Sequence, residues 1–197
     1  MIAILDYCAG NVFSLGNAIE RSGKSFVVTD NIDDVKAASH IVLPGVGDAS
    51  RVIAQMERRG LLNFLATTKK PVLGICIGMQ VLCSFSEEGD TLCAGVFAER
   101  VLKLRGGDVK IPHMGWNQVN DLKGPLFNGI ENGEWFYFVH SFAPSPGPAT
   151  ISKTTHGQLF SSALNIRNFY GTQFHPEKSG VAGEKLLRNF FELKEVD

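Results

Sequence analysis

The chain contains a cysteine, Cys76, with a glycine two residues before it and another two residues after it. This feature restricts the fold most, because an apolar run at residues 71–75 leads into it and a helix-like pattern follows. The G-x-C-x-G spacing is typical of the sharp strand-to-helix turn that lifts a nucleophile above the end of a sheet. Glycine suits both flanking positions, Gly74 and Gly78, because the turn needs backbone angles and a close approach that a Cβ would obstruct.

Short apolar strands alternate with helices through the rest of the first half. The hydrophobic pattern predicts strands at residues 2–6, 26–29, 40–43 and 72–75. It predicts helices at residues 12–21, 50–65 and 77–84, with Gly60 interrupting the second of them. Such alternation is typical of a mostly parallel sheet covered by helices on both faces.

The second half is dominated by strands, followed by a final helix at residues 184–192. Strands are predicted at residues 96–104, 116–119, 135–139, 150–154, 159–166 and 169–174, and several of them should form antiparallel hairpins appended to the main sheet. The predicted fold class is therefore α/β, with a mixed, mostly parallel central sheet flanked by helices and with appended antiparallel strands. No repeat or linker divides the chain, so residues 1–197 are expected to form a single domain.

Composition narrows the range of functions. The formal net charge is −1, which leaves no electrostatic footprint for nucleic acid or an anionic membrane surface. No signal peptide or membrane-length apolar run is found in the sequence. The four cysteines lack C-x-x-C spacing, which favours reduced thiols in a cytoplasmic protein over a disulfide framework.

The predicted position of Cys76 suits a nucleophile. A helix N-terminus favours the thiolate, and the N–H group of Ile77 is the natural first donor to an oxyanion. Gln80 lies one helical turn further on and should share the face of the cysteine, where its amide can reach a polar substrate. The alternative is a cysteine that only packs in the turn, which is the better interpretation for Cys83 and Cys93.

His175 is the predicted base among five histidines, because Glu177 follows it at strand spacing and can point the same way. A carboxylate bound to one ring nitrogen fixes the tautomer and leaves the other nitrogen free to take a proton. A structural histidine at a strand end is the alternative. Residues 44–47 follow the third strand directly and are therefore placed to supply a second oxyanion donor at the edge of the sheet. The alternative is an ordinary strand-to-helix connection, which this segment taken alone favours.

Taken together, these segments resemble the triad (class I) glutamine amidotransferases. The resemblance rests on L-P-G-V-G at residues 43–47, G-I-C-I-G-M-Q at residues 74–80 and F-H-P-E at residues 174–177. Residues 6–11, 112–117 (P-H-M-G-W-N) and 137–142 further resemble the family of glutaminase subunits that serve imidazole glycerol phosphate synthases. This resemblance implies hydrolysis of glutamine through a Cys76 thioester, with ammonia passed to a (β/α)8 barrel cyclase subunit in histidine biosynthesis.

The resemblance also implies roles for individual residues. The catalytic residues would be Cys76, His175 and Glu177, and the oxyanion hole would use Ile77 and Val46 after a flip of the peptide before Val46. Glutamine would be held by Gly47, Gln80, His140, Ser141 and Phe142. The surface facing the partner would include Asn11, Met114, Trp116 and Lys178. Without the resemblance, Met114 and Trp116 would be interpreted as core residues of a strand and Lys178 as a solvated lysine; with it, the partner-facing role is favoured for Trp116 and Lys178, and both interpretations stay open for Met114. No metal or cofactor is implied.

The chain departs from the family pattern at three positions. Cys8 stands where glycine is common, Ile77 where leucine is usual and Ser141 where threonine is common. Two other functions stay open at this stage: a glutaminase subunit of a different synthase or a related stand-alone cysteine hydrolase, and a non-catalytic module with the same fold. The P-H-M-G-W-N segment argues against the first alternative, and the intact Cys-His-Glu trio argues against the second.

Overall fold

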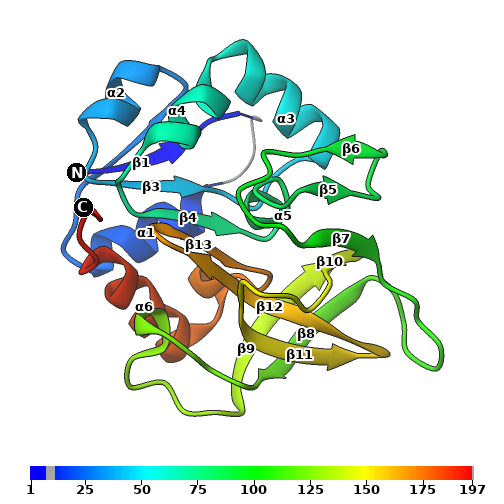
Figure 1. The fold of residues 1–197 in the computed structure, drawn as a ribbon. Helices are drawn as coiled ribbons and strands as arrows, with labels where there is room; N and C mark the ends of the chain where they lie inside the picture. Colours follow the sequence, from blue (N-terminus) through cyan, green and yellow to red (C-terminus); the bar gives the residue numbers. More distant parts are fainter. Residues whose placement is uncertain (8–11, 197) are drawn as a thin grey trace.

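The computed structural model describes residues 1–7 and 12–196 of the chain. Its centre is a seven-stranded sheet in the order β11-β12-β13-β4-β3-β1-β2 (Figure 1). Five strands run parallel: β1 (Ile2–Leu5), β2 (Phe26–Thr29), β3 (His40–Leu43), β4 (Val72–Ile75) and β13 (Phe169–Thr172). The antiparallel strands β12 (Gln158–Ile166) and β11 (Thr150–His156) extend it. The predicted mixed, mostly parallel sheet is confirmed.

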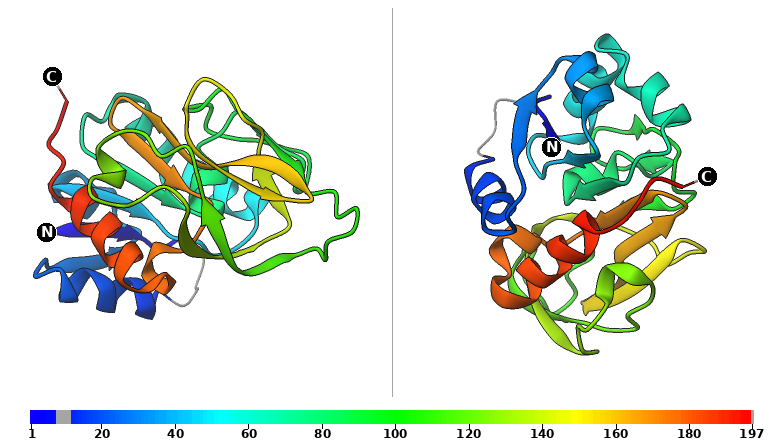
Figure 2. Two further views of the ribbon diagram at one scale, coloured as in Figure 1. Left: turned by 90° about the horizontal axis from the view of Figure 1, so that it is seen from below. Right: turned by 90° about the vertical axis from the view of Figure 1, so that its left-hand side faces the viewer.

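Helices cover both faces of this sheet, as alternation along β1 illustrates. Ile2 and Ile4 pack with side chains of α1 (Phe13–Arg21) and α6 (Gly180–Phe191). Ala3 and Leu5 point the other way, toward α2 (Ile32–Ala37), α3 (Ala49–Arg58) and α4 (Leu61–Thr67). Figure 2 shows α1 and α6 together on one side and the other three helices opposite. The sheet is therefore buried on both faces, which explains its nearly continuous apolar strands.

Two small sheets adjoin the central one. The first has the order β10-β7-β5-β6 and consists of β10 (Phe142–Pro144), β7 (Arg100–Lys103), β5 (Phe85–Ser86) and β6 (Thr91–Leu92). The second is the antiparallel pair β8 (His113–Val119) and β9 (Glu134–His140). Two short 3-10 turns, η1 (Pro125–Phe127) and η2 (Pro176–Lys178), complete the described elements.

The structure corrects several predicted boundaries. The helix after Cys76, α5 (Ile77–Gln80), ends four residues earlier than predicted. The carbonyls of Val81, Leu82 and Cys83 accept hydrogen bonds from the backbone of residues 94–97 instead of continuing the helix. The strand predicted at residues 96–104 begins only at Arg100, and α6 begins four residues before its predicted start. The sequence interpretation did not include α2, which is one and a half turns long and is capped by the Asn31 side chain.

In the part of the chain that the structure describes, no helix combines the length and the apolar character needed to cross a lipid bilayer.

Candidate active site

Cys76 occupies a strained backbone conformation directly between β4 and α5. Its φ and ψ are 51° and −111°, although non-glycine residues with positive φ are uncommon. Residues held in such sparsely populated regions tend to cluster at functional sites. From the sequence, the unusual backbone angles of this turn were expected at the two glycines. In the structure, the positive φ is that of Cys76 itself.

The two flanking glycines are required by close approach of the backbone. A Cβ on Gly78 would lie 2.1 Å from the carbonyl oxygen of Leu43, at the end of β3. A Cβ on Gly74 would lie 2.4 Å from the carbonyl oxygen of Gly78. The predicted close approach is therefore confirmed, and it presses α5 against the ends of β3 and β4.

His175 and Glu177 converge on Cys76 from the neighbouring parallel strand. The pairing of β13 with β4 brings the two chain segments together, and His175 follows three residues after β13. Nδ1 of His175 lies 2.8 Å from Oε1 of Glu177, and both side chains are buried. The imidazole Cε1 and the Cys76 Cβ lie 2.7 and 3.1 Å from the place where a Cβ on Gly45 would stand. Gly45 thus leaves room for the His175 imidazole and the Cys76 thiol to meet.

The electrostatics of His175 favour the imidazolium. Burial by itself would lower the pKa of His175, but the adjacent Cys76 thiol and the Glu177 carboxylate outweigh burial, so its pKa is raised to about 10. Its Nε2 atom is buried and makes no hydrogen bond within the described residues. The nitrogen opposite the carboxylate is thus available to hold the proton that a thiol at Cys76 loses.

A cavity of about 350 Å³ opens in front of Cys76. Most residues predicted from the sequence for catalysis, the oxyanion hole and substrate binding line it, namely Gly47, Cys76, Ile77, Gln80, His140, Ser141, Phe142 and His175. Lys178, which was predicted for the surface facing the partner, lines it as well. Val46 instead lines a neighbouring cavity of about 200 Å³, together with Pro44, Glu177 and Lys178. The 44–47 loop therefore lies between the two cavities, and the Tyr7 hydroxyl donates a hydrogen bond to its Pro44 carbonyl.

Two of the predicted substrate-binding side chains are already engaged inside the protein. Nε2 of Gln80 donates to the carbonyl of Phe142 at 2.7 Å and to Oε1 of Gln173 at 2.9 Å. The Nδ1 atom of His140 donates to the same carbonyl at 2.8 Å, and its Nε2 is 2.9 Å from Nδ1 of His113. Gln80 thus has only its Oε1 atom left for a ligand, and His140 can contact one only through its backbone.

Two functional candidates were missed by the sequence interpretation. Glu88 is the acidic side chain that lines the cavity, and its Oε2 accepts a hydrogen bond from the backbone N–H of Ala49. It lies in the turn between the short strands β5 and β6, where no periodic pattern marked it. Gln173 is fully buried and its Nε2 lies 3.6 Å from the Cys76 sulfur. Its spacing of two residues before His175 was a usable signal, because alternate residues of an extended chain point the same way.

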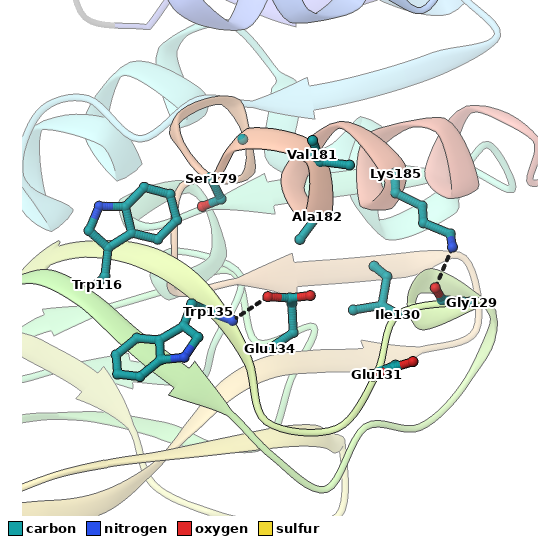
Figure 3. A pocket seen from close by; sticks show the side chains of 11 residues that line it. Trp116, Gly129, Ile130, Glu131, Glu134, Trp135, Ser179, Val181, Ala182 and Lys185 are labelled. Carbon is teal, nitrogen blue, oxygen red and sulfur yellow. Dashed lines mark hydrogen bonds between the residues drawn. The ribbon is translucent and has the colours of Figure 1, made fainter.

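The outer face of the β8–β9 pair carries exposed apolar side chains. Met114, Trp116 and Trp135 are each about half exposed or more. Trp116 and Trp135 line a hollow of about 440 Å³ between this pair and the start of α6, where Figure 3 shows Val181, Ala182 and Lys185. Nζ of Lys178 lies 6.0 Å from the centre of the neighbouring Tyr137 ring. Asn11, also predicted for this surface, and Cys8 fall outside the described residues.

Comparison with known proteins gives consistent results. Residues 3–193 match the family model described as glutamine amidotransferase class-I. The imidazole glycerol phosphate synthase subunit HisH of Bacteroides fragilis is 44% identical over 194 residues, spanning 98% of this chain and 99% of the relative. The protein of the same name from Vibrio parahaemolyticus is 45% identical over 199 residues, spanning 98% of both chains.

Solved structures of low sequence identity share the fold. A crystal structure of a glutamine amidotransferase superposes with a TM-score of 0.75 at 14% identity, covering 97% of both chains. The crystal structure of a glutamine amidotransferase from Thermotoga maritima gives a TM-score of 0.70 at 17% identity, covering 97% of this chain and 96% of that one.

Proposed function

Because the chain belongs to the class-I glutamine amidotransferases, and within them to the family of HisH subunits of imidazole glycerol phosphate synthase, we propose that it hydrolyses glutamine at Cys76 and supplies the ammonia to a cyclase subunit. The observation that carries this proposal is that Cys76 and His175 line one cavity, while Glu177 holds the His175 ring from behind through Nδ1. Residues 1–197 act as a single glutaminase domain in this proposal.

The proposed chemistry is acyl transfer through a thioester. The Cys76 sulfur attacks the side-chain amide carbon of glutamine after its proton passes to Nε2 of His175. The carbon–nitrogen bond then breaks, and the same proton goes to the departing ammonia. Water adds to the thioester with His175 as base, which releases glutamate and restores the thiol. Glu177 holds the ring in the required tautomer throughout.

The oxyanion and the substrate need further groups. Ile77 begins α5, so its N–H group has no carbonyl partner within the helix and is free to donate to the oxyanion. A flip of the peptide between Gly45 and Val46 would supply the second donor. Oε1 of Gln80 and the backbone of Gly47 and of residues 140–142 would hold the glutamine.

The charged ends of glutamine also find partners in the cavity. The Glu88 carboxylate is suited to the α-ammonium group of glutamine, because charge-assisted hydrogen bonds are about twice as strong as neutral ones. Lys178 lines the same cavity and carries the opposite charge, which suits the α-carboxylate.

The proposed partner is a (β/α)8 barrel cyclase, which would use the ammonia to make imidazole glycerol phosphate and aminoimidazole carboxamide ribotide in histidine biosynthesis. The exposed Met114 and Trp116 support a docking role for the outer face of β8, because aromatic and methionine side chains are enriched at interfaces. Lys178, at the rim between this face and the cavity, would connect docking with catalysis. Asn11 stays in the proposed interface on family resemblance. The alternative is a glutaminase subunit of a different synthase.

A glutaminase assay with and without the cyclase and its nucleotide substrate tests the proposal. We expect strong activation by the loaded cyclase and no detectable hydrolysis by Cys76→Ala, which should still bind the partner. Ammonia release by the variant at saturating partner would refute the nucleophile assignment. Full activity of the isolated wild-type chain would refute the dependence on a partner.

A further inference from the structure

The Cys76 sulfur has a second polar neighbour besides the base. Nε2 of Gln173 lies 3.6 Å from Sγ, within the range of a hydrogen bond to sulfur, and Gln173 is fully buried. The sulfur is also 3.8 Å from the carbonyl oxygen of Val139, which only the protonated thiol can engage as a donor. An N–H group directed at sulfur favours the thiolate, because a hydrogen bond to the charged form stabilises that form.

The orientation of the Gln173 amide follows from its neighbours. The Phe142 carbonyl can only accept, so the Gln80 atom 2.7 Å from it must be the amide nitrogen. The second hydrogen of that nitrogen points to Gln173 at 2.9 Å, which must therefore present its oxygen there. The NH₂ group of Gln173 consequently faces the Cys76 sulfur. Only one orientation of each side-chain amide satisfies these hydrogen bonds, so the surrounding structure fixes the N–H group of Gln173 as the donor to the sulfur.

A second chain of hydrogen bonds ends at the same Phe142 carbonyl. His140 donates to it through Nδ1, so in its neutral form Nε2 must accept from Nδ1 of His113. Nε2 of His113 accepts in turn from the side-chain amide of Asn117 at 3.2 Å, which also donates to the carbonyl of Thr155. Burial lowers the pKa of His113 to about 4 and, against the Phe142 hydrogen bond, that of His140 to about 3, so both rings are neutral at pH 7.

We propose that Gln173 is a positioning residue for Cys76, whose amide N–H group, oriented through Gln80 and the Phe142 carbonyl, holds the sulfur and stabilises its thiolate. This inference rests on the proposed function only for its catalytic meaning, because the ionisation of Cys76 can be measured without glutamine or a partner. Gln173 supplements His175, which removes the proton, by lowering the free energy of the anion that remains.

Variants at Gln173 test this directly. Gln173→Glu keeps the shape but places a carboxylate oxygen where the N–H group was, and Gln173→Leu removes the polar group. Ser162→Ala is the matched control. Ser162 is as buried as Gln173, and the variant loses a side-chain hydrogen bond to Ser152, which does not involve Cys76. The charged groups that face the cavity, Glu88, His175 with Glu177, and Lys178, stay unchanged in all three variants.

The readout is the rate at which iodoacetamide alkylates Cys76 in the whole chain between pH 5.5 and 9, resolved by peptide mass spectrometry. We expect the rate at pH 7 to fall about three- to tenfold for Gln173→Leu, with the profile displaced to higher pH by up to one unit, and further for Gln173→Glu. Ser162→Ala should stay within about twofold of the wild type. Wild-type alkylation profiles for both Gln173 variants would overturn the proposal.

Glutamine hydrolysis measured on the same preparations separates the two proposals. Displaced alkylation profiles in a chain that never releases ammonia with its cyclase would refute the proposed function and support the role of Gln173. Unchanged alkylation profiles in a chain that hydrolyses glutamine normally would refute only the role of Gln173. Near-ultraviolet circular dichroism identifies a misfolded Gln173→Leu, in which case the near-isosteric Gln173→Glu decides.

Discussion

Replacing Gly78 by alanine should displace Cys76, the proposed nucleophile, without changing any of the proposed reacting groups. The new Cβ would stand 2.1 Å from the Leu43 carbonyl oxygen and 2.8 Å from its carbon, both backbone atoms, whereas real Cβ contacts are essentially never shorter than 3.0 Å. Relieving the overlap needs a movement of about 1 Å between α5 and β3, and a misplacement of that size costs about 100-fold in rate. Overpacking adds a destabilisation of about 1–3 kcal/mol.

Steady-state glutamine hydrolysis with saturating cyclase, together with thermal unfolding, measures both effects. We expect kcat/KM to fall about 100-fold and the melting temperature to fall by about 2–12 °C, since each kcal/mol lowers it by about 2–4 °C in a chain of this length. Gly95→Ala is the control. Gly95 has a φ of 69°, so an alanine there would have a strained backbone, but its Cβ would meet no atom within 4 Å. Its stability should fall by about 1 kcal/mol with activity retained. Wild-type activity in Gly78→Ala would refute the close-packing argument.

Three further predictions concern charge. Lys178→Ala should reduce activation of glutamine hydrolysis by the loaded cyclase while leaving the melting temperature unchanged, and the reverse pattern would make Lys178 a structural residue. Glu88→Gln should raise KM for glutamine about tenfold with kcat nearly unchanged, which initial-rate kinetics would measure. The lowered pKa values of His113 and His140 mean that the unfolded chain binds more protons between about pH 6.5 and 4, so the free energy of unfolding should fall as pH drops through that window. The raised pKa of His175 acts mainly above pH 6.5, so between pH 7 and pH 5 it offsets only a small part of this loss. Chemical unfolding at pH 7 and pH 5 tests the sign, and His113→Gln should show a smaller difference.

The sequence predicted those strands and helices whose positions depend on their own residues and on the residues next to them. The four short strands of the first half were found because they are mostly apolar and because turn residues lie beside them, as Pro44 does directly after β3 and Pro71 directly before β4. The end of α5 was wrong because the backbone of residues 94–97 determines it, and nothing within the helix marks that contact. The capped helix α2 was missed because six residues are too few for a helical period to stand out.

In the candidate site too, residues in short motifs could be predicted from the sequence, whereas contacts between distant segments could not. Cys76, His175 and Glu177 were predicted because each lies in a short motif with its own chemistry, and the structure brings them together, although their catalytic roles stay predictions. The sequence could not show that the amide of Gln80 is engaged by Phe142 and Gln173, because those contacts join residues more than sixty positions apart. Glu88 was missed because it lies in the turn of the β5–β6 hairpin, and these two-residue strands are too short for an alternating pattern to show.

The insertion of β13 beside β4 has a consequence for the newborn chain. The ribosome produces the thiol of Cys76 about a hundred residues before it produces His175, and the two meet only when the last strand takes its place in the sheet. Incomplete chains released before that point carry Cys76 without His175 and Glu177, the proposed base and its carboxylate. Under the proposed chemistry, hydrolysis of glutamine therefore has to wait until β13 and residues 175–177 have been made and have taken their place beside β4.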